Sequence, residues 1–156
     1  MNILKLVVSI VICQGAGIVG SVFTASSIPT WYATIAKPAF NPPNWIFAPV
    51  WTTLFLLMGI SLYLVWQKGL SKKESKIALS LFGLQLGLNI VWSLLFFGLK
   101  SPGLAFFEII ILWVAIALTI VKFKPISKNA AILLLPYIAW VSFAAVLNFA
   151  IWGLNP

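Results

Sequence analysis

The sequence predicts an all-α membrane protein: a bundle of five transmembrane helices, with the N-terminus in the cytoplasm and the C-terminus outside. The chain of 156 residues is 62% hydrophobic and 8% charged, which leaves too little polar surface for a soluble globule. Its apolar residues form five runs of about 18 to 23 residues, each long enough to cross a hydrocarbon core of roughly 30 Å as a helix. The runs are 4–26, 45–66, 77–99, 104–121 and 130–152.

The lysines give the expected orientation. Five crossings place the two termini on opposite sides, and the ten basic residues, all lysines, then divide unequally. The side of the N-terminus holds Lys5, Lys68, Lys72, Lys73, Lys76, Lys122, Lys124 and Lys128, and the other side holds Lys37 and Lys100. This asymmetry is the positive-inside pattern. The net charge of +8 is therefore explained by topology and contact with anionic membrane lipids, and nucleic-acid binding is not expected.

The first run, 4–26, is predicted to stay attached as a helix. It begins beside a lysine and ends on small residues, as a signal peptide does, but it is longer than a signal core. Residues 15–20 match the dinucleotide fingerprint GxGxxG. No strand precedes the match and no acidic residue follows about 20 positions later, so we interpret these glycines as allowing close helix approach or leaving space for a ligand.

The segment 28–44 is predicted to be a lid-like loop. It contains four prolines, which disfavour regular helix, and these alternate with Trp31, Tyr32 and Phe40. Such aromatic residues fit two interpretations, a belt at the headgroup boundary or a lid over a cavity in the bundle. The connections after the second, third and fourth runs are short, which makes sequential helices antiparallel neighbours.

Two tryptophans lie too deep for interfacial anchors. Trp51 is about seven residues into the second run and Trp140 about twelve from the end of the fifth, near the midplane or in the outer half at 1.5 Å per residue. Residues that share their helical faces are Phe55 and Met58 with Trp51, and Ala144, Leu147 and Ile151 with Trp140. We therefore expect a ligand cavity beneath the lid. Pro136 is expected to kink the fifth helix.

The third run presents two faces. Gln85, Asn89 and Trp92 have helical spacing and are expected to face the cavity. Ser80, Gly83 and Gly87 lie on the opposite face in a pattern of small residues, which predicts a homodimer interface.

The residue inventory excludes conventional hydrolases and metalloenzymes. The chain has no histidine and two carboxylates, so no metal site or Ser/His/Asp arrangement can be assembled. One carboxylate, Glu108, is intramembrane, and three roles remain open for it: proton-coupled transport, contact with a ligand, or an ordinary hydrogen-bonded partner.

Several motifs resemble the translocator protein family, TspO/MBR, also described as tryptophan-rich sensory or peripheral-type benzodiazepine-receptor proteins. They are PAFNPPNW at 38–45, APVWTTL at 48–54, QLGLN at 85–89, FFG at 96–98, LPYIAW at 135–140 and AVLN at 145–148. The resemblance runs in order over nearly the whole chain, and the lysine-rich version resembles bacterial members in the cell membrane.

The resemblance implies a five-helix, commonly dimeric protein that binds porphyrins such as protoporphyrin IX and isoquinoline-carboxamide drugs. It also implies light-dependent porphyrin breakdown in bacterial members, with Trp51 and Trp140 at the matching positions. Animal relatives bind cholesterol near the end of the last helix. Here the stretch 146–153 reads VLNFAIWG and lacks the central tyrosine and the closing basic residue, which argues against cholesterol.

Three functions remain open: a tetrapyrrole-binding sensor, which is favoured; a transporter of porphyrins or other lipophilic ligands; and an unconventional enzyme in which an excited porphyrin supplies the reactivity. The predicted ligand-binding residues are Tyr32, Pro42, Trp51, Phe55, Asn89, Trp140, Phe143, Ala144 and Leu147.

Overall fold

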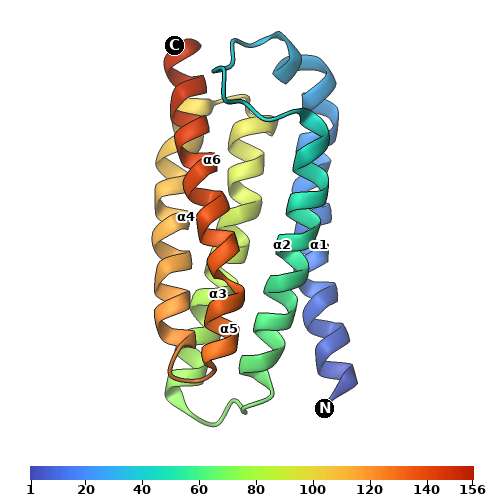
Figure 1. Ribbon diagram of the computed structural model, residues 1–156, viewed down its shortest axis with the longest axis vertical. Helices are drawn as coiled ribbons and strands as arrows, with labels where there is room; N and C mark the ends of the chain where they lie inside the picture. Colours follow the sequence, from blue (N-terminus) through green and yellow to red (C-terminus); the bar gives the residue numbers. More distant parts are fainter.

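The computed structural model describes residues 1–156 as a bundle of long helices without strands (Figure 1). Five helical segments are long and apolar enough to cross a membrane. The elements are α1 (Ile3–Ser27) with η1 (Ile28–Tyr32), α2 (Asn44–Trp66), α3 (Lys73–Ser93) with η2 (Leu94–Gly98), α4 (Pro102–Phe123), α5 (Lys128–Leu133) and α6 (Leu135–Leu154). The predicted all-α membrane class is confirmed.

The first helix extends further than the sequence suggested. Instead of ending near residue 26, it continues through η1, a π-helical turn that contains Pro29. A proline inside an α-helix removes one hydrogen bond and clashes with the carbonyl four residues earlier. The wider π-turn accommodates it without ending the helix. The irregular part of the predicted 28–44 loop is therefore residues 35–43, called the lid below.

The last membrane segment is interrupted at Leu134, between α5 and α6. Pro136 lies in the first turn of α6, where its missing N–H requires no partner within the helix. Leu134 itself is buried, so the break lies inside the bundle. The segment is thus interrupted two residues before Pro136, and the predicted kink between its two parts stays a prediction.

Lipid-facing and core residues separate clearly along each helix. On α1, for example, the exposed large apolar residues include Val7, Val11, Ile18 and Val22, whereas Cys13 and Ala16 are buried. An apolar outer surface of this extent is the mark of a chain that lies in lipid. The chain is an integral, multi-pass membrane protein.

The two ends of the bundle differ in charge and covering. The N-terminus lies at one end with the α2–α3 and α4–α5 connections, and the lid lies at the other with the C-terminus (Figure 1). At the first end, the Lys5 ammonium lies 5.5 Å from the ring centre of Trp66, so α1 and α2 meet there. The lysine-rich connections gather at this end, as predicted. That it faces the cytoplasm stays a prediction.

Candidate ligand-binding cavity

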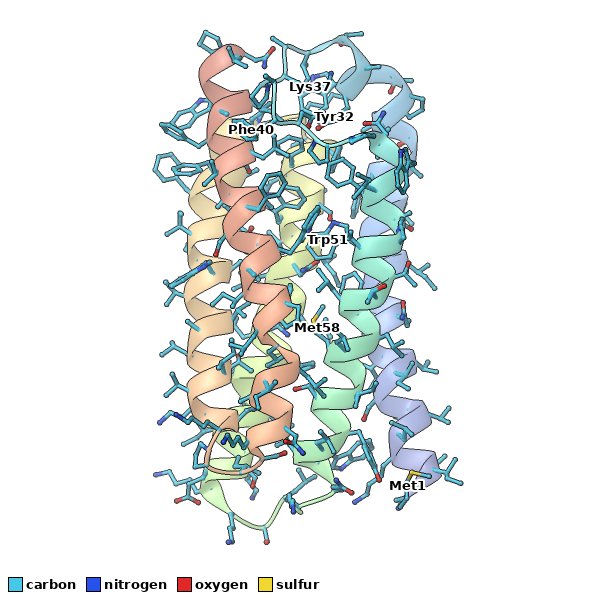
Figure 2. All side chains as sticks on the ribbon, viewed as in Figure 1. Met1, Tyr32, Lys37, Phe40, Trp51 and Met58 are labelled. Carbon is cyan, nitrogen blue, oxygen red and sulfur yellow. The ribbon has the colours of Figure 1, made fainter.

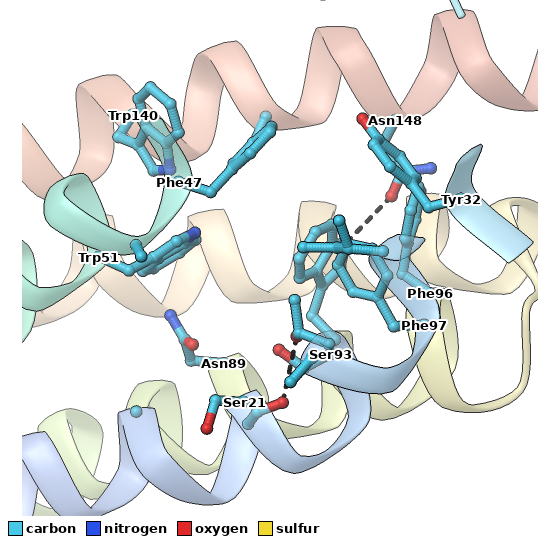
Figure 3. Close-up of a pocket in the computed structure, with 18 of the residues that line it drawn as sticks. Ser21, Tyr32, Phe47, Trp51, Asn89, Ser93, Phe96, Phe97, Trp140 and Asn148 are labelled. Atoms are coloured by element: carbon cyan, nitrogen blue, oxygen red, sulfur yellow. Dashed lines mark hydrogen bonds between the residues drawn. The ribbon is translucent and has the colours of Figure 1, made fainter. Parts of the chain in front are cut away.

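A cavity of about 260 Å³ lies in the half of the bundle nearer the lid. Residues of α1, η1, α2, α3, η2 and α6 line it, whereas α4 and α5 contribute none. Fourteen of the 21 lining residues are hydrophobic and none is charged. Figure 3 shows its aromatic and amide side chains arranged around an open centre. Recognition here must rest on shape, apolar contact and aromatic rings, with a few polar atoms to orient the ligand.

Seven of the nine predicted ligand-binding residues line this cavity. They are Tyr32, Trp51, Phe55, Asn89, Trp140, Ala144 and Leu147. The other two, Pro42 and Phe143, are not lining residues. Phe143 packs behind the cavity against Trp140, with 5.4 Å between ring centres. That these residues bind a ligand stays a prediction, but the helical faces of Trp51 and Trp140 do converge.

Aromatic rings join α2 to α6 beside the cavity. The ring centres of Phe47 and Trp140 lie 6.1 Å apart, and those of Trp51 and Tyr137 lie 6.4 Å apart. Both pairs are edge-to-face, an arrangement that aromatic quadrupoles favour. The Nε1 atom of Trp140 is buried without a hydrogen-bond partner. The wall is thus built from rings that pack by their edges rather than from polar contacts.

The amide groups of α3 are largely committed to the scaffold. Asn89 Nδ2 donates to Tyr137 Oη over 2.8 Å, and that hydroxyl donates to Gln85 Oε1 over 2.8 Å. Gln85 is 1% exposed and lies behind the wall, so its predicted cavity position is wrong. Because Tyr137 satisfies Gln85, the glutamine joins helices instead of meeting a ligand.

A second hydrogen-bonded chain supports the end of the cavity nearer the lid. Trp92 Nε1 donates to Asn148 Oδ1 over 3.0 Å, and Asn148 Nδ2 donates to the carbonyl oxygen of Pro102 over 2.7 Å. Both Trp92 and Asn148 line the cavity. These bonds hold α3, α6 and the start of α4 together, and they fix the orientation of both side chains.

One wall of the cavity, formed by α1 and the start of η1, was absent from the predicted ligand-binding residues, although the glycines of 15–20 were interpreted as allowing close helix approach or leaving space for a ligand. It consists of Gly17, Gly20, Ser21, Thr24 and Ala25 of α1 and Ile28 of η1. A Cβ atom on Gly17 would lie 2.7 Å from the Phe55 ring, and one on Gly20 would lie 3.2 Å from Ser93 Oγ. These glycines therefore bring α1 close to α2 and α3. The recurrence of small residues every three or four positions was the available signal.

The lid closes over one end of the bundle and is tied at two places. Tyr32 Oη donates to Asn41 Oδ1 over 2.7 Å. The side chain of Asn155 accepts from the N–H of Ala36 over 3.0 Å and donates to its carbonyl over 2.8 Å. Tyr32, Lys37 and Phe40 all lie at this end, above Trp51 (Figure 2). The segment thus lies over this end of the bundle, but none of its residues between Tyr32 and Phe47 lines the cavity, so that it acts as a lid stays a prediction.

Glu108 lies outside the cavity lining. It is 7% exposed, and neither carboxylate oxygen has a hydrogen-bond partner. The structure therefore contradicts the interpretation of Glu108 as an ordinary hydrogen-bonded partner, and it does not place the residue against a ligand in this cavity.

Comparison with known proteins identifies relatives over nearly the full chain. Residues 9–153 match the model of the TspO/MBR family. The tryptophan-rich protein TspO of Archaeoglobus fulgidus is 52% identical over 155 residues, which is 99% of each chain. The corresponding protein of Chlorobaculum tepidum is 46% identical, over 99% of this chain and 98% of its own. The human translocator protein is 39% identical over 138 residues, 88% of this chain and 82% of its own.

Proposed function

Because the chain belongs to the TspO/MBR family, we propose that it binds tetrapyrroles of the protoporphyrin IX type in the cavity beneath the lid. The observation that carries the proposal is the cavity itself, which is uncharged, rich in aromatic rings and lined by both Trp51 and Trp140. A planar conjugated ring gains stacking and edge contacts from such side chains. Isoquinoline-carboxamide drugs, which are also flat and apolar, are expected to compete for the same space.

The charge distribution supports an orientation for this activity. With the lysine-rich end in the cytoplasm, the lid and cavity lie in the outer half of the membrane. The ligand then enters from the outer leaflet or the outer aqueous phase. Binding and sensing is favoured over transport because the sequence contains no internal repeat, whereas alternating-access transporters are commonly built from repeats with broken helix pairs.

The proposal predicts saturable binding in a defined membrane. Protoporphyrin IX added to the protein in lipid nanodiscs should quench its tryptophan fluorescence with a single binding isotherm, and an isoquinoline carboxamide should reverse the quenching. Empty nanodiscs control for partition into lipid. Linear, non-saturating quenching, or quenching that the drug leaves unchanged, would contradict binding in the cavity. Porphyrin flux measured in proteoliposomes would reveal transport.

A light-dependent breakdown of the bound porphyrin is the second candidate function. The feature that favours it is the placement of two oxidisable indole rings, Trp51 and Trp140, on the same cavity. In this activity the excited ligand supplies the reactivity and the protein supplies the site.

We also propose that the protein dimerises through the small-residue face of α3. Ser80, Gly83 and Gly87 are exposed in the single chain, and a Cβ atom at either glycine would have no neighbour within 4 Å. A face so flat allows two backbones to approach closely in lipid, where packing drives helix association.

Replacing Gly83 and Gly87 together with leucine should therefore shift the detergent-solubilised protein from dimer to monomer. Light scattering coupled to size-exclusion chromatography measures the change. Gly15→Leu is the matched control, because Gly15 also has no neighbour within 4 Å but lies on α1. Porphyrin affinity should remain, since the cavity lies on the other side of α3. A dimer that survives the double substitution would place the interface elsewhere.

A further inference from the structure

Lys37 is the one charged residue of the lid, and its ammonium group is held in a fixed position. Nζ donates to the carbonyl oxygen of Tyr32 over 2.6 Å and to that of Ile35 over 3.0 Å. It also lies 4.8 Å from the centre of the Tyr32 ring, within the range of a cation–π contact. A flexible surface lysine would not be anchored by three such interactions.

The charge of Lys37 has no partner of opposite sign among the side chains. The chain has two carboxylates. Glu74 is in the first turn of α3, at the opposite end of the bundle, and both oxygens of Glu108 lack a donor. An ammonium has three N–H donors, and the two carbonyls occupy two of them. One donor and a full positive charge therefore remain for another group, in a partly buried position where a charged hydrogen bond is strong.

The position of this charge is close to the ligand cavity. Tyr32, whose ring lies under the ammonium, is 2% exposed and lines the cavity. One aromatic side chain thus separates Lys37 from the cavity, and the cavity lining itself contains no charged residue. The lining therefore offers a ligand no cation, whereas Lys37 contacts the ring of a lining residue.

We infer that Lys37 binds a carboxylate of the ligand, so that the cavity selects planar aromatic acids over their neutral esters. The apolar ring lies among the cavity side chains, and a short flexible arm carries the carboxylate past Tyr32 to the free donor of Lys37. Protoporphyrin IX has this form, with two propionate arms on a flat ring. This inference rests on the proposed function and specifies the chemical class of its ligand.

The experiment compares protoporphyrin IX with its dimethyl ester, which has the same ring and no charge. Both are titrated in uncharged lipid nanodiscs against the parent, Lys37→Met, Lys37→Arg and Lys100→Met. Methionine keeps an unbranched apolar stem and removes the charge, whereas arginine keeps the charge. Lys100→Met removes the other lysine from the lid end, where Lys100 is exposed and does not line the cavity.

We expect Lys37→Met to weaken the acid about tenfold and the ester less than twofold, whereas Lys37→Arg and Lys100→Met keep the parent's preference for the acid. Equal losses for both ligands would show that Lys37 only holds the lid, and unchanged affinities would show that it has no part in binding. Either result overturns the inference and leaves the proposed function intact. Failure of both ligands to bind the parent would instead overturn the proposed function, and this inference with it.

Discussion

Replacing Trp51 and Trp140 together with phenylalanine is expected to remove most of the light-driven loss of porphyrin absorbance while porphyrin affinity changes by less than about tenfold, roughly 1.4 kcal/mol. Both indoles line the cavity, so both can meet the ring of a bound porphyrin. Phenylalanine preserves most of the apolar contact but removes the easily oxidised ring. The measurement is absorbance under steady illumination, with affinity taken from a separate titration in darkness.

Light should be required because the chain offers no dark route. It has no histidine, and no charged side chain lines the cavity that could act as a general base. The matched control is Trp113→Phe, which removes an indole that is exposed on α4 and whose Nε1 donates to Ser142 Oγ over 2.8 Å, outside the cavity. Full activity of the double variant, or turnover in darkness, would leave the protein with a binding or transport role alone.

Ala144→Phe, which enlarges one apolar residue, is expected to be the most damaging conservative change to binding. Ala144 lines the cavity on α6, one helical turn from Trp140. A phenyl ring there occupies the space of the ligand, and overpacking of this kind costs about 1–3 kcal/mol. That cost corresponds to a loss of affinity between about fivefold and 150-fold. Quenching titrations with protoporphyrin IX measure it directly.

The control for this change is Ala139→Phe, which adds the same ring to α6 at an exposed position outside the cavity. It should bind porphyrin like the parent. Comparison of the two thermal unfolding curves separates a blocked cavity from a damaged fold. Parent-like affinity in Ala144→Phe would show that the ligand does not lie against α6.

Much of the fold follows from the order of apolar and polar residues along the chain. In lipid, each backbone polar group must be paired within its own helix, so a run of the right length and hydropathy is already a spanning element. Because each span is a helix, the residues that share one face of it could also be predicted from helical periodicity. Trp51 with Phe55 on α2, and Trp140 with Ala144 and Leu147 on α6, lie on one cavity as their spacing predicted, whereas Met58, placed on the same face as Trp51, is buried outside the lining.

The family resemblance that the motifs indicated is also confirmed, over residues 9–153. A family resemblance indicates which positions of the chains correspond, but it does not show what each side chain contacts. The structure was needed to show that Pro42 and Phe143 stand outside the lining whereas the small residues of α1 belong to it.

By itself the sequence determined that the chain has five membrane spans, which end of the bundle gathers the lysines, and most of the helical faces that meet in the cavity. Only the tertiary structure showed which polar side chains line the cavity and which are hydrogen-bonded to another helix behind it. Gln85 and Asn89 have equivalent positions on one face of α3, yet Tyr137 of α6 binds both and only Asn89 lines the cavity. From the sequence alone Pro29 was compatible with a loop, whereas in the structure it lies in the helical turn η1. Periodicity fixes the direction in which a side chain points, whereas its partner belongs to another helix, and only packing brings that helix within bonding distance.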